Sequence, residues 1–182
     1  MAIVRNFLGN DIDIPEDRLY SVGAHFWFRR VSDGEFEVGI TEPGVALTGG
    51  LVELDVLAEP AVGIVPSEEV AFATTRKAIK YFMSPVGGTV TAANVASTDA
   101  DSGATPDSGA TAATVNEAPY DVWLFRMTLA AGADATLVDG VTYAAKLAAS
   151  EHATDAAAAG AAAAKAGKIS PTCKSIYSGI KL

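Results

Sequence analysis

The alternation of apolar and polar residues over positions 19–91 predicts a series of short β-strands. Short segments rich in aromatic and β-branched residues are separated by turn residues, as in HFWFRRV, EFEVGIT and LVELDVL over positions 25–57. Short strands at this spacing are typical of an all-β barrel or sandwich. The glycine of Ser32-Asp33-Gly34 can supply the positive φ of a tight turn, so residues 25–41 are predicted to form a hairpin.

A second predicted hairpin carries a lysine at its turn. Residues 70–75 and 78–83 have the composition of strands, and Arg76 and Lys77 lie where the chain must reverse. A lysine at such a turn is accessible on all sides on a flexible stem, while the two strands fix its root. A modifying enzyme could reach this side chain, and a cofactor attached to it could swing.

Small and polar residues replace the strand pattern over positions 95–115, VASTDADSGATPDSGATAATV. This segment has no aromatic residue, Lys or Arg, so it buries too little surface to offset its ordering entropy. It is predicted to be a flexible loop inserted in the domain. Its Asp99, Asp101 and Asp107 lack the spacing of a calcium-binding EF-hand loop, and we interpret them as solvated acids.

The last third of the chain begins with one further strand and then becomes rich in alanine. The strand is predicted within NEAPYDVWLFRMTLA, at positions 116–130, and the alanine-rich part starts at about position 139. Alanine favours helix, but no broad apolar stripe follows Leu147, so we expect a short docked helix and a fraying, helix-prone tail. The chain is therefore predicted to divide into an N-terminal arm (1–18), a β domain (19–150) and a C-terminal extension (151–182).

Composition and charge exclude several classes of protein. The chain has 182 residues, with 13 basic and 22 acidic side chains and a formal net charge of −9, whereas nucleic-acid binding needs concentrated Lys and Arg. Its single cysteine, Cys173, cannot form an internal disulfide or a zinc cluster, so reducing cytoplasm is the expected compartment. No apolar segment is long enough to span a membrane, since the uncharged run at 81–98 is interrupted by Pro85.

No pattern typical of a catalytic site is present. The sequence has no Ser, His and acid grouping, no HExxH, no GxGxxG and no phosphate-binding loop, so the chain is predicted not to be an enzyme. His25 lies in a β-run without a partner nucleophile, where a structural histidine is the simplest interpretation. Trp27 and Trp123 are interpreted as core aromatics.

Four short motifs occur in order along positions 19–150. They are HFWFR followed by VGIT (25–41), TTRKA (74–78), PVGGTV (85–90) and NEAPY with a tryptophan at 123. In order and spacing they resemble His-x-Trp-Val-Arg with Val-Gly-Ile-Thr, Glu-Ser-Val-Lys-Ala, Pro-Val-Ser-Gly-Glu-Val, and Asn-Glu-x-Pro-Tyr of the H protein of the glycine cleavage system and its lipoate-binding relatives. Residues 14–20 also look like the entry strand of relatives that serve bacterial sulfur oxidation.

This resemblance implies a mainly β fold, a barrel-sandwich hybrid of two small sheets with short helices, in which lipoic acid is amide-linked to Lys77 by a lipoate-attaching enzyme. Thr74, Thr75 and Arg76 then form the attachment turn, and His25 lies near the lipoyl arm. The family's acidic residue, its serine and its small apolar residue before the lysine are here Thr74, Thr75 and Arg76, so the turn changes from acidic to basic.

Two functions are compatible with these motifs. The first is a non-catalytic carrier that shuttles an intermediate between the enzymes of a multienzyme system. By resemblance its passenger is either the aminomethyl group of glycine cleavage, exchanged with a pyridoxal-phosphate decarboxylase, an aminomethyltransferase and a flavin dehydrogenase, or a sulfur species in lipoate-dependent sulfur oxidation. The alternative is an unlipoylated structural or interaction module within a larger assembly, which the basic turn and the C-terminal extension favour.

Overall fold

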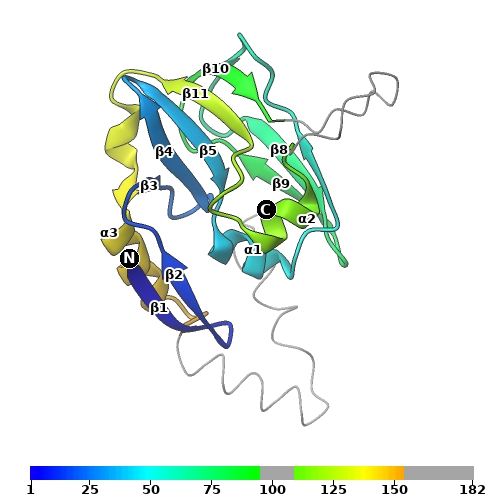
Figure 1. Cartoon of the computed structure of the whole chain (residues 1–182), viewed down its shortest axis with the longest axis vertical. Helices are drawn as coiled ribbons and strands as arrows, with labels where there is room; N and C mark the ends of the chain where they lie inside the picture. Colours follow the sequence, from blue (N-terminus) through cyan, green and yellow to red (C-terminus); the bar gives the residue numbers. More distant parts are fainter. Residues whose placement is uncertain (95–108, 154–182) are drawn as a thin grey trace. The chain divides into compact units, whose positions relative to one another are not determined.

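The computed structural model of the chain describes residues 1–94 and 109–153 (Figure 1). The chain forms two compact units, one of Asp17–Asp139 and one that joins Met1–Glu16 to the segment beginning at Gly140. Most of the loop predicted at 95–115 and nearly all of the extension predicted at 151–182 lie outside the described residues. Within the described ranges, no helix has the length and apolar composition needed to cross a membrane.

The larger unit contains two antiparallel sheets. The seven-stranded sheet has the strand order β12-β3-β4-β5-β11-β10-β7. In that order its strands are Val138–Asp139, Leu19–Tyr20, Phe26–Ser32, Glu35–Ile40, Phe125–Leu129, Gly88–Ala93 and Gly63–Ile64. The three-stranded sheet has the order β6-β8-β9, with strands Glu53–Val56, Glu69–Thr74 and Ile79–Met83.

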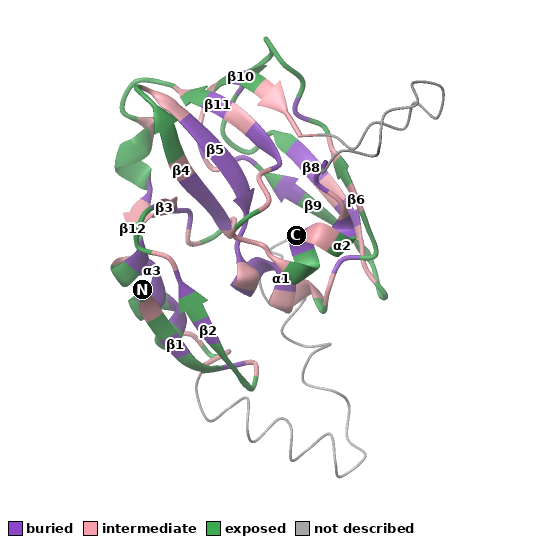
Figure 2. Cartoon of the chain, viewed as in Figure 1, coloured by how far each residue is buried: buried purple, intermediate pink, exposed green. Residues whose placement is uncertain are grey.

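The main hydrophobic core lies between these two sheets. Phe26 of β4 contacts Phe82 of β9 with ring centroids 6.0 Å apart, and it contacts Phe125 of β11 at 6.5 Å. Buried residues follow β4, β5 and β8, whereas the connecting segments are mostly exposed (Figure 2). Apolar residues from both sheets thus share one core, and the predicted barrel-sandwich hybrid is confirmed.

Both predicted hairpins are present. Strands β4 and β5 pair from Phe26 opposite Ile40 to Ser32 opposite Glu35, and Gly34 has the positive φ of 79° that the turn requires. Strands β8 and β9 pair from Thr74 opposite Ile79 onward. Sequence alternation sets these registers because one face of each strand enters the core.

Two short helices belong to the larger unit, and one of them corrects a prediction. Helix α1 (Glu42–Thr48) is capped by Thr41, whose hydroxyl accepts from the Gly44 N–H at 3.2 Å. Helix α2 (Ala112–Glu117) begins inside the predicted loop, so that prediction is wrong for residues 112–115. The loop composition was misleading because Thr111 caps the helix and the only large apolar side chain, Val115, is fully buried.

The smaller unit is a hairpin packed on a helix. Strands β1 (Ala2–Phe7) and β2 (Asn10–Ile14), which occupy the predicted N-terminal arm, pack against helix α3 (Gly140–Ala148). The hairpin and the helix both contribute buried apolar side chains, which are Val4, Phe7, Ile12, Ile14, Tyr143, Ala144 and Leu147. The Leu8 N–H donates to the carbonyl of His152 at 2.8 Å, and the Phe7 and His152 rings meet edge to face. This unit therefore has its own small core.

Candidate functional site

The turn between β8 and β9 holds Lys77 at its tip. The Thr75 N–H donates to the Ala78 carbonyl at 2.9 Å, so Arg76 and Lys77 are the two central residues of the turn, and both are exposed. The Thr75 hydroxyl donates to the same carbonyl at 2.8 Å and accepts from the N–H groups of Lys77 at 3.3 Å and Ala78 at 3.1 Å. One side chain therefore closes the turn with its full hydrogen-bonding capacity.

The base of this hairpin is fixed in the core. Val70, Ala71 and Ala73 of β8 and Phe82 of β9 are buried, and β6 continues the pairing because the Val52 N–H donates to the Thr74 carbonyl at 2.8 Å. Apolar side chains at the root hold both strands, while the residues at the tip face solvent. The backbone at Lys77 is thus held in place at the exposed tip of the hairpin.

Thr74 and Thr75 differ from the glutamate and serine of the family motif, but the structure retains similar chemical groups near Lys77. Thr75 supplies a hydroxyl, as the serine of the family motif would, and this hydroxyl is the group that closes the turn. Thr74 lies directly opposite Glu53 of β6, and residues directly opposite in an antiparallel pair point to the same face. A carboxylate is therefore present one strand away from the position where the family motif has its glutamate.

His25 lies immediately before β4 rather than within it. Its φ is +55°, its N–H donates to the Ser21 carbonyl at 3.1 Å, and its carbonyl accepts from the Thr41 N–H at 2.9 Å. A Cβ added at Gly44 would lie 2.9 Å from the His25 Cβ, so the residue is packed against the first turn of α1. These contacts support a structural role, and contact with a lipoyl arm stays a prediction.

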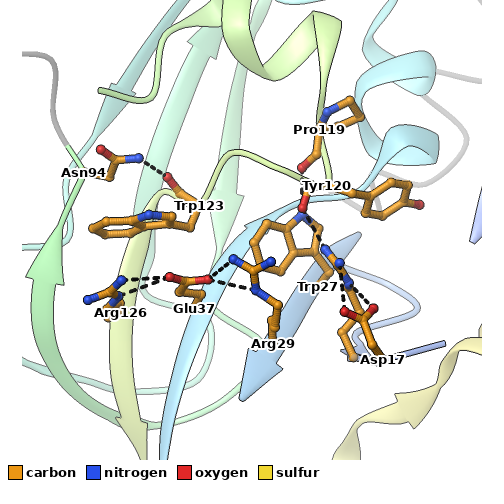
Figure 3. Close-up of polar contacts among 10 residues, drawn as sticks. Asp17, Trp27, Arg29, Glu37, Asn94, Pro119, Tyr120, Trp123 and Arg126 are labelled. Carbon is orange, nitrogen blue, oxygen red and sulfur yellow. Dashed lines mark hydrogen bonds and ion pairs between the residues drawn. The ribbon is translucent and has the colours of Figure 1, made fainter. Parts of the chain in front are cut away.

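Aromatic and charged side chains form a row across the face of the larger sheet that is turned away from the core (Figure 3). The row consists of Trp123, Arg126, Glu37, Arg29 and Trp27. Trp27 is fully buried in this row, and its Nε1–H donates to the Pro119 carbonyl at 2.8 Å. A Cβ on Gly39 would lie only 2.4 Å from Cζ2 of Trp27, so the indole requires a glycine on the neighbouring strand. Trp123, in contrast, is only partly buried, so its interpretation as a core residue is wrong.

Glu37 is the buried carboxylate of this row, and it lies between two arginines. Arg29 donates to its Oε2 through Nε at 2.9 Å, and Arg126 donates to its Oε1 through Nη2 at 2.9 Å. The Arg126 guanidinium also lies 4.7 Å from the Trp123 ring centroid. Burial raises the pKa of Glu37, but the hydrogen bonds from Arg29 and Arg126 outweigh it, so this pKa lies below its ordinary value of 4.5.

Arg18 extends the row toward the loop after α2. It is buried, lies 4.9 Å from the Trp27 ring centroid and 5.5 Å from that of Tyr120, and donates to the Tyr120 carbonyl at 2.8 Å. Its hydrogen bonds lower the pKa of the neighbouring Asp17. Through Arg18 and Trp27 the NEAPY segment is thereby held against β4.

Arg18, Glu37 and Arg126 were not among the site residues predicted from the sequence. A signal was present, because Arg29, Glu37 and Arg126 each interrupt an apolar strand, and the pairing of β4, β5 and β11 then brings the three side by side. No group of three or more His, Cys, Asp or Glu side chains that could hold a metal ion occurs in residues 1–94 and 109–153.

Replacing Glu37 with glutamine is expected to destabilise the fold by about 1–3 kcal/mol at neutral pH, because the amide cannot accept from two guanidinium groups as the carboxylate does. The lowered pKa of Glu37 means that its contribution is present above pH 4.5 and is lost as the pH falls through the folded-state value. Denaturant unfolding from pH 7 to pH 3 should therefore show a difference between variant and natural chain that shrinks on acidification. Glu53→Gln, at an exposed position, is the matched control, and a loss that is equal at every pH would contradict this account.

Comparison with known proteins identifies the family. The family described as "Glycine cleavage H-protein" matches residues 19–150. The chain belongs to the glycine cleavage H-protein family. The match includes both sheets of the larger unit and helix α3, whereas β1 and β2 of the N-terminal hairpin lie outside it.

Several H proteins are similar to most of this H-family chain. A glycine cleavage system H protein from Burkholderia cenocepacia is 36% identical over 132 residues, which cover 72% of this chain and 94% of the relative. One from Thiobacillus denitrificans is 34% identical over 135 residues, covering 72% and 93%. The crystal structure of a glycine cleavage system H protein from Mycobacterium marinum superposes with a TM-score of 0.56 at 25% identity, over 73% of this chain and 98% of that one.

Proposed function

We propose that this chain is a lipoyl carrier of the H-protein type, in which the Nζ of Lys77 is joined by an amide bond to the carboxyl of lipoic acid. The observation that carries the proposal is the position of Lys77 at the exposed tip of a hairpin whose base is buried. Family membership supports it, because the TTRKA motif of this chain corresponds in place to the attachment motif of the family.

The residues of the turn fit such an attached group. The Thr75 hydroxyl fixes the backbone on both sides of Lys77, so an attaching enzyme would meet the lysine in one backbone conformation. Lys80, the nearest other lysine, lies within β9 opposite Ala73 and not at the turn. Glu53 beside Thr74 supplies negative charge near a turn that otherwise carries Arg76 and Lys77.

The proposed pathway is glycine cleavage, because the similar relatives are proteins of that system. When attached, lipoate supplies a reducible disulfide that can take up and release a passenger group. The chain itself would hold the root of the arm and offer its surface to the decarboxylase, the aminomethyltransferase and the flavin dehydrogenase, without turnover of its own. A sulfur passenger is the other outcome that the motifs allow.

A second candidate is an H-like interaction module that carries no lipoate. The observation that favours it is the N-terminal hairpin, which lies outside the family match and builds a separate small core with α3. The arginine beside Lys77 also distinguishes this turn from the acidic turn of the family motif. In this case the larger unit would serve as a rigid binding domain.

Intact-mass spectrometry of the protein from its native source is the deciding experiment. The expected result is a mass increase equal to one lipoyl group, which persists in Lys80→Arg and disappears in Lys77→Arg. Arginine retains the positive charge but cannot form the amide, so the loss would identify the attachment atom. Unmodified protein recovered in a stable complex would support the interaction module instead.

A further inference from the structure

In the part of the chain that the structure describes, strand β9 forms an edge of the three-stranded sheet and pairs with β8 on one side. The Ala78 carbonyl accepts from Thr75 and the Ser84 N–H donates to the Glu68 carbonyl at 2.8 Å, so the backbone groups of even-numbered residues point toward β8. Since these groups alternate along a strand, those of Ile79, Tyr81 and Met83 point away from it. Among the described residues none of these outward groups has a hydrogen-bond partner.

The same three residues also expose their side chains. Ile79 is 55% exposed, Tyr81 49% and Met83 37%, and the Tyr81 ring contacts the half-buried Phe72 with centroids 6.2 Å apart. Natural proteins often protect an edge strand with proline, a bulge or charged side chains, lysine in particular. Residues 79–83 contain no proline, and the bulge of this hairpin lies on β8. Their one charged residue, Lys80, alternates with the three exposed apolar residues and therefore lies on the other face of the strand, together with Phe82. Within residues 1–94 and 109–153 the outer side of this edge is therefore unpaired, and the face that carries Ile79, Tyr81 and Met83 is apolar.

We propose that β9 pairs in antiparallel fashion with β9 of a second copy of this chain. In the proposed register Tyr81 of one copy lies opposite Tyr81 of the other. Ile79 of each copy then lies opposite Met83 of the other copy. In this register the residues with outward backbone groups face one another, so their N–H and C=O groups can all be satisfied. The contact is self-complementary about a two-fold axis and closes as a dimer.

Charge favours the antiparallel orientation. Arg76 and Lys77 precede β9, whereas Glu68 and Glu69 lie beside its other end, since Glu69 is opposite Met83. Antiparallel pairing brings the basic turn of one copy toward the acidic end of the other. Strands lie about 4.8 Å apart, so the long side chains face one another across about 10 Å, where opposite charges still attract at moderate salt.

The pairing leaves the lysine turns accessible. With about 3.4 Å per residue, the two Lys77 residues lie about 27 Å apart, at opposite ends of the paired strands. The joined sheet would have six strands and one continuous apolar face around the two Tyr81 rings. A contact of one short strand from each copy is small, so the dimer is expected to form reversibly with protein concentration.

Sedimentation velocity of the full chain over about a hundredfold range of concentration tests this pairing. The natural chain is expected to shift from monomer to dimer, and Tyr81→Lys is expected to raise the dissociation constant by tenfold or more, because it places like charges opposite each other at the two-fold axis. Val31→Lys, at a position 41% exposed on β4, is the control and should leave the dissociation constant unchanged. Thermal unfolding of each variant checks that it is folded.

A crosslink tests the register. Directly opposite residues in a hydrogen-bonded pair have Cα atoms about 5.5 Å apart, within the range of a disulfide. In a Cys173→Ser background, Tyr81→Cys should give a disulfide-linked dimer on oxidation, whereas Val31→Cys should not. A monomer at every concentration, or equal crosslinking at both positions, overturns the proposal, even if a strand of another protein binds this edge. Neither readout involves lipoate, so the result is independent of the proposed carrier function.

The orientation has its own test by charge reversal. Arg76→Glu and Glu69→Arg should each weaken the dimer, because each places like charges at the facing ends of the two strands. The double variant should recover most of the natural dissociation constant, since the charges then attract again with their positions exchanged. Losses that simply add in the double variant would exclude the antiparallel arrangement.

Discussion

Gly39→Ala is expected to destabilise the larger unit by about 3 kcal/mol and to lower the melting temperature by about 10 °C. The added Cβ would lie 2.4 Å and 2.5 Å from Cζ2 and Cε2 of Trp27 and 2.7 Å from the Val122 carbonyl oxygen. The indole cannot move away, because it is fully buried, is held by Pro119 and lies against Arg18. Calorimetry or thermal unfolding by circular dichroism measures the loss.

Two variants separate the clash from a general effect of alanine. Gly23→Ala is the matched control, since a Cβ at Gly23 meets nothing within 4 Å, and its stability should change by less than about 0.5 kcal/mol. Combining Gly39→Ala with Trp27→Phe removes part of the indole, so the double variant should lose less than the sum of the two single losses. If Gly39→Ala had the same melting temperature as the natural chain, Trp27 could not be packed against Gly39 of β5 in this way.

Lys77→Arg is expected to abolish carrier function while leaving the fold unchanged. If lipoate is attached at Lys77, glycine decarboxylation by the three reconstituted partner enzymes should fall to the level measured without carrier. The guanidinium of arginine keeps the charge but does not form the amide, and the exposed side chain contributes little to stability. Activity and melting temperature measured on the same preparation separate loss of the arm from loss of the fold.

Variants of neighbouring residues make this result specific to the turn. Lys80→Arg should keep full activity, because Lys80 lies along β9 and not at the tip. Thr75→Ser keeps the hydroxyl and should be modified normally, whereas Thr75→Val loses three hydrogen bonds and should be modified more slowly. Full activity of Lys77→Arg would mean that lipoate is attached to another residue or is not attached to this chain.

Strand positions were largely predictable because they depend on local patterns. The alternation in residues 25–41 and 70–83 gave both hairpins with their turns, and Gly34 marked one turn by its conformational freedom. Helix α2 was not predictable in the same way, since its sequence has the composition of a loop. It forms because Val115 is buried and because the Asn116 side chain makes two hydrogen bonds to the backbone of Leu51. Asn116 Oδ1 accepts from the Leu51 N–H at 2.9 Å, and Asn116 Nδ2 donates to the Leu51 carbonyl at 2.8 Å.

The row of aromatic and charged side chains could not be predicted from local sequence patterns either. Arg29, Glu37 and Arg126 are distant in sequence, and only the order β4-β5-β11 makes them neighbours. The contact of His25 with Gly44 likewise depends on how α1 follows β5. A single sequence carries the residue types of such contacts but not their distances.

The sequence by itself determined the mainly β fold, the family and the lysine at a hairpin turn. Each follows from short-range patterns, namely strand alternation, turn residues and motif spacing. Only the tertiary structure decided that the Thr75 hydroxyl closes the turn, that Glu53 lies opposite Thr74, and that β9 has no second partner strand among the described residues. The physical reason is that hydrogen bonds across strands and exposure of an edge depend on which strands pair, and pairing between distant segments is set by the packing of the whole core.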